Sequence, residues 1–187
     1  VNTDPLEKAA YVQLYDTRLM KIAQVECTPG AFSTSDSDLC WELSVDGDKL
    51  YVGYSTKVVE YDTELTHLWT HNDVLGRHLA VKNGMIVGAD DTYVQFNNVL
   101  HDVVINVIRF RADGEYFAYT DANADRVFIL LKNATSPLSS VEVKSTSLDW
   151  FGEFLLVAGG DEVGVYDVNG NRVHSFPVTV TQISASV

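Results

Sequence analysis

The chain has 187 residues, with 26 acidic against 13 basic side chains and a formal net charge of −13 at pH 7. A protein this acidic repels a phosphate backbone or an anionic bilayer, and its Lys and Arg residues are scattered singly rather than gathered in a patch. We therefore expect neither nucleic acid nor a membrane as a direct ligand. An apolar content of 46% is ordinary for a globular protein and argues against disorder.

A repeated segment is the main feature of the sequence. Its first copy is Tyr11–Asp16 (YVQLYD), and four further copies end at Asp62, Asn97, Lys132 and Asp167, at intervals of 35 residues. The interval from Asp16 to Asp62 is 46, so about eleven residues are inserted between the first two copies. A fixed period of about 20 to 50 residues predicts an architecture of repeated structural units. We assign all the repeats to a single domain spanning residues 1–187.

Each of the last four copies follows a hairpin signal. Asp46-Gly47, Asn83-Gly84 and Asp113-Gly114 separate runs rich in β-branched and aromatic residues, and Phe151-Gly152 takes the same place in the last repeat. One repeat therefore reads as four short strands. In chain order we predict strands at Leu39–Val45, Lys49–Ser55, Lys57–Asp62, Leu65–His71, His78–Lys82, Met85–Ala89, Thr92–Asn97, Val99–Val104, Asn106–Arg111, Tyr116–Thr120, Arg126–Leu131, Leu138–Val143, Ser147–Trp150, Phe154–Gly159, Val163–Asp167 and Arg172–Val178.

Four-stranded units at this spacing are typical of β-propeller blades. Over residues 11–187 the chain resembles the WD-repeat (WD40-like) family in divergent form, because Tyr15-Asp16, Tyr61-Asp62 and Tyr166-Asp167 stand where that family has Trp-Asp. Asp91 and Asp161 match its tight-turn aspartate, and His78 resembles its structural histidine at a blade entrance. The resemblance implies an all-β propeller of four-stranded antiparallel blades that binds other proteins.

The predicted strands do not fill whole blades. The chain opens with the third and fourth strands of a blade, and Thr181–Val187 reads as a lone first strand with alternating Ile183, Ala185 and Val187. This gives about four and a half to five blades. We expect one blade to lack a strand that another chain or further sequence supplies, with self-closure of a five-bladed ring as the alternative.

Acidic residues gather in the predicted loops of one face. Loops between second and third strands, and those between blades, lie on the same face of such a propeller. We assign to this face the candidate partner-binding residues Asp36, Asp38, Asp90, Asp91, Asp121, Asp125 and Asp161, together with Phe32 at the tip of the inserted loop Glu26–Asp38. Their clustering favours a partner with a basic surface, while the competing interpretation is that they cap turns or are merely solvated.

No pattern of catalytic or metal-binding residues stands out. Asp121–Asp125 has the alternating oxygens of a calcium loop but lacks its glycine and its bidentate glutamate, and His67 and His71 are too far apart on one strand to share zinc. We therefore predict neither an enzyme nor a cofactor. Trp41, Trp69 and Trp150 fall on strands and are expected in the core.

Two cysteines, Cys27 and Cys40, are too few for a disulfide scaffold. We place one past an outer strand and the other on an innermost strand, a blade's width apart, and so predict free thiols and an intracellular location. The leading hypothesis is a non-catalytic protein–protein interaction module, a scaffold subunit of a larger assembly. The alternative is a secreted or periplasmic propeller enzyme, or a sugar-binding lectin, that uses the central pocket.

Overall fold

The computed structural model describes residues 11–26, 40–145, 147–180 and 182–185, which form 18 strands. Strands β1 (Tyr11–Tyr15) and β2 (Lys21–Glu26) make a two-stranded antiparallel sheet. The other strands form four sheets of four, each antiparallel and in chain order: β3 (Glu42–Asp46), β4 (Lys49–Gly53), β5 (Lys57–Tyr61) and β6 (His67–Asn72); β7 (His78–Lys82), β8 (Met85–Ala89), β9 (Tyr93–Phe96) and β10 (Val99–Asp102); β11 (Ile108–Phe110), β12 (Tyr116–Asp121), β13 (Arg126–Leu131) and β14 (Ser139–Glu142); and β15 (Ser147–Phe151), β16 (Phe154–Gly159), β17 (Glu162–Tyr166) and β18 (Arg172–Phe176).

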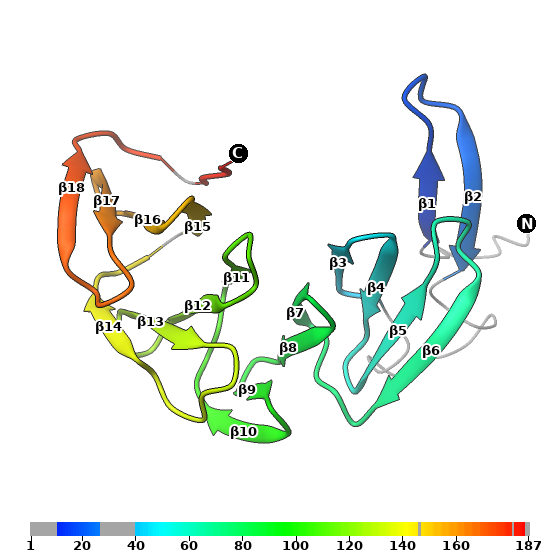
Figure 1. The fold of residues 1–187 in the computed structure, drawn as a ribbon, viewed down its shortest axis with the longest axis horizontal. Coiled ribbons are helices and arrows are strands. Elements are labelled where there is room, and N and C mark those ends of the chain that lie inside the picture. The colour runs from blue at the N-terminus through cyan, green and yellow to red at the C-terminus, as the bar shows by residue number, and fades with distance from the viewer. Residues whose placement is uncertain (1–10, 27–39, 146, 181, 186–187) are drawn as a thin grey trace, which may run out of the picture.

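The sheets stand one after another as blades along an open arc (Figure 1). The first strands β3, β7, β11 and β15 line the inner side of the arc, and the fourth strands lie outside. The β1–β2 sheet forms one end and the blade β15–β18 the other, and no described strand of the last blade pairs with β1 or β2. The predicted all-β propeller fold of about four and a half blades is therefore confirmed, and within the described residues the ring is not closed.

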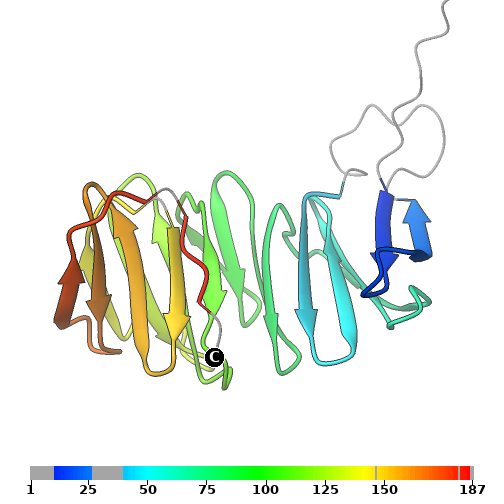
Figure 2. The same cartoon turned by 90° about the horizontal axis from the view of Figure 1, so that it is seen from above.

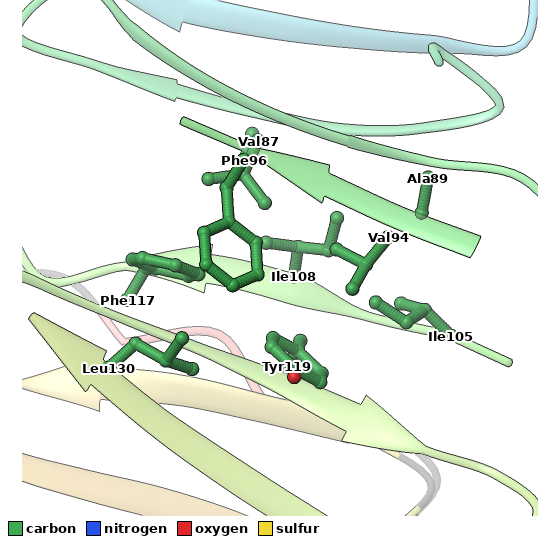
Figure 3. Close-up of a cluster of buried hydrophobic side chains, with 10 residues drawn as sticks. Val87, Ala89, Val94, Phe96, Ile105, Ile108, Phe117, Tyr119 and Leu130 are labelled. Carbon is green, nitrogen blue, oxygen red and sulfur yellow. The ribbon is translucent and has the colours of Figure 1, made fainter. Parts of the chain in front are cut away.

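Facing blades bury the apolar core between them. In the largest cluster, Phe96 of the second complete blade packs against Phe117 of the third, with ring centroids 5.3 Å apart in an edge-to-face arrangement (Figure 3). Tyr119 lies beside them, and its burial raises the pKa of its hydroxyl to about 12. Similar clusters fill the other spaces between neighbouring blades, so each blade depends on the next for its core.

Each Tyr-Asp dipeptide starts a turn of the same kind, between the third and fourth strands of its sheet. Asp16, Asp62 and Asp167 each accept hydrogen bonds through Oδ1 from the backbone N–H groups two and four residues later. The third residue after each Asp has a positive φ of 62°, 62° and 79°, at Leu19, Leu65 and Gly170. The repeated aspartate is therefore explained locally, because its carboxylate satisfies N–H groups that the turn leaves unpaired.

The hairpin predictions hold at residue level. Gly47, Gly84, Gly114 and Gly152 all have positive φ values between 57° and 74°, which a glycine adopts without steric cost. The third strands end at Tyr15, Tyr61, Phe96, Leu131 and Tyr166, each one residue before the predicted end of its repeat. The inner first strand of the third complete blade is shorter than predicted, since β11 covers Ile108–Phe110 alone.

Candidate functional site

The predicted loop face is one edge of the arc, made by the loops between second and third strands and the loops between blades (Figure 2). Asp90 and Asp91 lie between β8 and β9, and Asp161 lies between β16 and β17. Asp121 ends β12 and Asp125 precedes β13. Equivalent loops of three successive blades therefore carry these carboxylates along the edge. Phe32, Asp36 and Asp38 lie outside the described residues.

Two of these aspartates both cap a turn and keep an oxygen available. Oδ1 of Asp90 accepts from the N–H groups of Thr92 and Tyr93, at 2.7 and 2.8 Å. Oδ1 of Asp121 accepts from Asn123 and Ala124, at 3.0 and 3.2 Å. Within the described residues, Oδ2 of neither side chain accepts a hydrogen bond. Capping thus fixes each carboxylate in place and leaves its second oxygen for a ligand.

Asp91 belongs to a cluster that joins two blades. Its carboxylate pairs with the Arg77 guanidinium, which stacks on the Trp41 ring with 4.6 Å from Cζ to the ring centroid. The Asp91 side chain is 73% exposed, and Trp41 is 44% exposed. An exposed Trp–Arg pair beside a carboxylate has the composition of an energetically important contact in protein interfaces.

The tryptophan predictions were right at one position and wrong at two. Trp150 is buried, and its Nε1 donates to the Arg109 carbonyl at 3.1 Å. Trp41 and Trp69 are exposed: Trp41 precedes β3 and contacts Arg77 of the loop before β7, and Trp69 lies on the outer strand β6.

Asp125 and Asp161 are held less firmly. Asp125 has a positive φ of 48°, and its carbonyl accepts from the Val143 N–H at 2.8 Å. Asp161 accepts from the Thr179 hydroxyl at 3.3 Å. Next to it, Glu162 forms an ion pair with Arg172. These carboxylates therefore extend the loop face without forming one compact cluster with Asp91.

The loop before β7 is tightly packed, which fixes the position of Arg77. Gln95 bridges this loop, since its Oε1 accepts from the Leu75 N–H and its Nε2 donates to the Asp73 carbonyl, both at 3.0 Å. A Cβ on Gly88 would overlap the Leu75 carbonyl oxygen. Glycine is required there because two backbone segments approach more closely than a side chain permits.

The inner strands are linked sideways by side chains. Glu42, Ser44 and Asp46 of β3 accept from the N–H groups of Leu79, Val81 and Gly84 in or just after β7, at 3.0, 2.8 and 2.9 Å. These N–H groups face away from β8, so the neighbouring blade satisfies what would otherwise be a free sheet edge. A pocket of about 300 Å³ lies among β3, β7 and β11 in the central channel.

The C-terminal segment repeats this arrangement on the last blade. Ser147 Oγ and Asp149 Oδ2 of β15 accept from the N–H groups of Ile183 and Ala185, at 3.2 and 2.7 Å. Thr181–Val187 was predicted to be a first strand, but residues 182–185 form no regular strand. Ile183 and Ala185 are half-buried while Gln182 and Ser184 are exposed, so the predicted alternation is present.

The cysteine prediction is wrong. Cys40 is disulfide-bonded. It does not lie on an innermost strand, since β3 begins at Glu42, and it packs on the same apolar cluster as Val25 near the end of β2. The assumed separation of a blade's width therefore does not apply. Cys27, the other cysteine of the sequence, lies outside the described residues.

Three of the histidines, His67, His71 and His78, have a polar partner nearby. His71 contacts the Glu60 carboxylate at 3.3 Å, His67 contacts the Thr70 hydroxyl at 2.9 Å, and His78 lies 3.6 Å from Glu42. The described part of the chain contains no group of three His, Cys, Asp or Glu side chains placed to hold a metal ion. It also contains no helix of a length and hydrophobicity that could cross a membrane.

No family model and no curated protein match this sequence. Among solved structures, Hsv2 from Kluyvelomyces marxianus is similar with a TM-score of 0.63 and 11% identity, over 88% of this chain and 57% of that one. KlHsv2 with loop 6CD replaced by a Gly-Ser linker gives 0.64 and 11%, over 91% and 62%. The chain thus spans about six tenths of the structures that it matches. Together with the blade topology, this similarity shows that the chain is a β-propeller arc.

Proposed function

We propose that this chain is a non-catalytic interaction module, a scaffold subunit that binds a basic protein surface through its loop face. The observation that carries the proposal is the set of pre-positioned carboxylates on successive blades. Asp90 and Asp121 are fixed by turn hydrogen bonds through one oxygen, and Asp91 stands exposed beside Trp41. Rigid carboxylates lose little conformational entropy on binding a cation, and their combined field steers a basic partner to the site.

We also assign the repeats to the WD-repeat family in divergent form. The Tyr-Asp turns support this assignment, because the same carboxylate capping and the same positive-φ position recur at Asp16, Asp62 and Asp167. Membership in that family would fit a binding role, although the fold itself supports many functions.

Charge removal on the loop face tests the proposal. Asp90, Asp91, Asp121 and Asp161 are replaced together by Asn, whose Oδ1 can still cap the two turns. Binding of a lysine-rich synthetic peptide is followed by stopped-flow fluorescence at low and high salt. We expect the on-rate at low salt to fall about tenfold and its salt dependence to flatten.

The matched control removes the same charge from the opposite edge. Asp16, Asp48, Asp62 and Asp167 are replaced by Asn, which also preserves the capping oxygens of the three Tyr-Asp turns. The control should bind the peptide much as the native chain does. Equal losses in both variants would mean that the peptide senses net charge alone, and would contradict a specific role for the loop face.

The disulfide at Cys40 favours a second candidate, a secreted propeller that binds a sugar in its central pocket. Ser44, Lys82, Arg109 and Arg111 line that pocket and could donate hydrogen bonds to hydroxyl groups. Asn133 begins an Asn-Ala-Thr glycosylation triplet in an exposed turn. Expression through a secretory pathway, followed by mass spectrometry and a glycan-array screen, tests this candidate. A glycan on Asn133 together with glycan binding that Arg109→Ala abolishes would favour it over the interaction module.

A further inference from the structure

The second complete blade is split between its two central strands. β8 and β9 pair at two positions, Gly88 with Gln95 and Ala89 with Val94. The corresponding strands pair at four positions in the first complete blade, at six in the third and at five in the fourth. Residues 85–87 of β8 therefore lie beside β7 on one side and have no paired strand on the other.

The split leaves one backbone position without a partner. Leu79 and Val81 of β7 direct their N–H groups away from β8, toward Glu42 and Ser44. The register pairs Val81 with Ile86, so the N–H and C=O groups of Ile86 face away from β7, toward β9. Within the described part of the chain, neither of these two groups of Ile86 has a hydrogen-bond partner.

The other complete blades fill this position with their own third strand. In each of them, the second-strand residue at the register position of Ile86 pairs with an apolar or aromatic residue of the third strand. These pairs are Leu50–Tyr61, Phe117–Leu130 and Leu155–Tyr166. Phe117 and Leu155 are fully buried, whereas Ile86 is half-buried. The position beside Ile86 therefore suits an extended residue with an apolar side chain.

A pocket of about 480 Å³ lies at the split. Met85 and Ile86 of β8 line it, together with Gln95 and Phe96 of β9. Most of the lining comes from turns at the edge of the arc opposite the loop face, at residues 82–85, 97–98 and 132–133 (Figure 2). The pocket is therefore separate from the loop-face carboxylates.

The lining is basic although the chain is acidic. Lys82, Lys132 and His71 line the pocket and none of the described Asp or Glu side chains does, in a chain with a net charge of −13. The Lys82 ammonium lies 4.0 Å from the Asp46 carboxylate, and Lys132 pairs with Glu115. A carboxylate that enters the pocket therefore meets two ammonium groups and no like charge.

Apolar and basic groups lie on different faces of the split. Ile86 packs with Val74 on the face toward the first complete blade. Met85 packs with the cluster toward the third complete blade, and Lys82 shares its face because the two residues pair. Successive residues of an extended peptide point to opposite faces, so an apolar residue followed by an acidic one matches both.

We propose that the split between β8 and β9 binds an extended acidic peptide from a partner protein. One peptide residue exchanges both backbone hydrogen bonds with Ile86 and places an apolar or aromatic side chain beside Val74. The carboxylate of the next residue pairs with Lys82 or Lys132. This site does not depend on the function proposed for the loop face.

A capped tetrapeptide of residues 165–168, Val-Tyr-Asp-Val, is the probe, because Tyr166 fills the equivalent position in the fourth complete blade. It is titrated into the full chain, and binding is followed by calorimetry and by hydrogen exchange of the Ile86 amide. We expect saturable binding that slows this exchange at least about tenfold. The same peptide with Asn in place of its Asp should bind about fivefold more weakly.

Chain variants locate the carboxylate. Lys82→Gln combined with Lys132→Gln should weaken binding of the tetrapeptide about tenfold and flatten its salt dependence. Lys21→Gln combined with Lys144→Gln removes the same charge from residues that do not line the pocket. This matched control should bind the tetrapeptide as the native chain does.

Three results would overturn the proposal. One is a saturating tetrapeptide that leaves the exchange of the Ile86 amide unchanged. Another is an Ile86 amide that is as protected in the free chain as those of Phe117 and Leu155, because the split would then already be filled. The third is a capped aspartate that binds as tightly as the tetrapeptide, because the pocket would then recognise a carboxylate without a strand.

Discussion

The two ends of the arc differ in which strands of a blade the structure describes. At the C-terminal end, residues 183 and 185 donate to side chains of β15, in the position that a first strand of a further blade would take. At the other end, β1 and β2 correspond to a third and a fourth strand, and no described strand takes the place of the first two. Leu148 of β15 packs against the preceding blade and is fully buried, while its equivalent Leu43 is half exposed. Both positions hold a leucine at the same register position of a first strand. The difference in exposure therefore shows that the neighbouring blade decides which side chains of a propeller strand are buried.

The largest expected effect is on the free energy of unfolding, which should differ among Ala variants of these leucines. Leu43, Leu79 and Leu148 occupy one register position and are 50%, 2% and 0% exposed. Replacement of Leu79 or Leu148 by Ala should cost about 2–5 kcal/mol of unfolding free energy, from lost burial and a cavity. Leu43→Ala should cost less than about 1 kcal/mol. Urea unfolding measures all three, and an equal cost at Leu43 would mean that its face is covered.

Removal of the C-terminal segment should make the two ends alike. Deletion of Thr181–Val187 exposes the inner face of β15 and frees the acceptors Ser147 and Asp149. We expect a loss of about 1–2 kcal/mol and a melting temperature lower by a few degrees. Differential scanning calorimetry and sedimentation check this. An unchanged melting temperature and an unchanged mass would show that the segment does not act as a blade strand.

A single acceptor should matter less than the whole segment. Asp149→Ala removes the bond to the Ala185 N–H and should cost about 1 kcal/mol, with faster exchange of that amide. Asp149→Asn keeps an acceptor oxygen and serves as the control. Glu42→Ala should speed exchange of the Leu79 amide in the same way. Exchange of Ala185 that is already fast in the native chain would contradict the docked position.

The smallest effect concerns a feature that both ends share, the Tyr-Asp turn. Hydrogen bonds from Thr66 lower the pKa of Asp62, and those from Asn171 lower the pKa of Asp167. The unfolded aspartates therefore take up protons first as the pH falls, so these turns stabilise the fold above the ordinary carboxyl pKa of 3.8 and lose that contribution below it. Asp62→Asn and Asp167→Asn should each flatten the acid limb of the stability curve slightly and similarly. Unequal changes would break the equivalence of the two turns.

The fold was predictable because its signals are local. Asn83-Gly84 and the Tyr-Asp pairs specify turns within a few residues, and their even spacing specifies the blade. The sequence analysis also gave turn capping as one of two interpretations for Asp90, and the structure shows this capping. These features need no knowledge of what lies in the next blade.

Other features could not be predicted because they depend on neighbours distant in sequence. Trp41 contacts Arg77, which lies far from it in sequence, in the loop before β7. Asp149 acts as an acceptor for Ala185 only once the C-terminal segment returns to the inner side of the arc. Cys40 was misplaced because the boundary of β3 was set too early in the sequence.

The openness of the arc is tested most directly by amide hydrogen exchange at four equivalent positions of the isolated chain. Leu79 and Val81 donate to Glu42 and Ser44, so their amides should be protected to nearly the global unfolding free energy. Leu43 and Val45 face no acceptor among the described residues, so their amides should exchange at least a hundredfold faster, or about 2.7 kcal/mol in protection. Equal protection at all four positions would contradict the open arc, because it would show that β3 already has an inner neighbour.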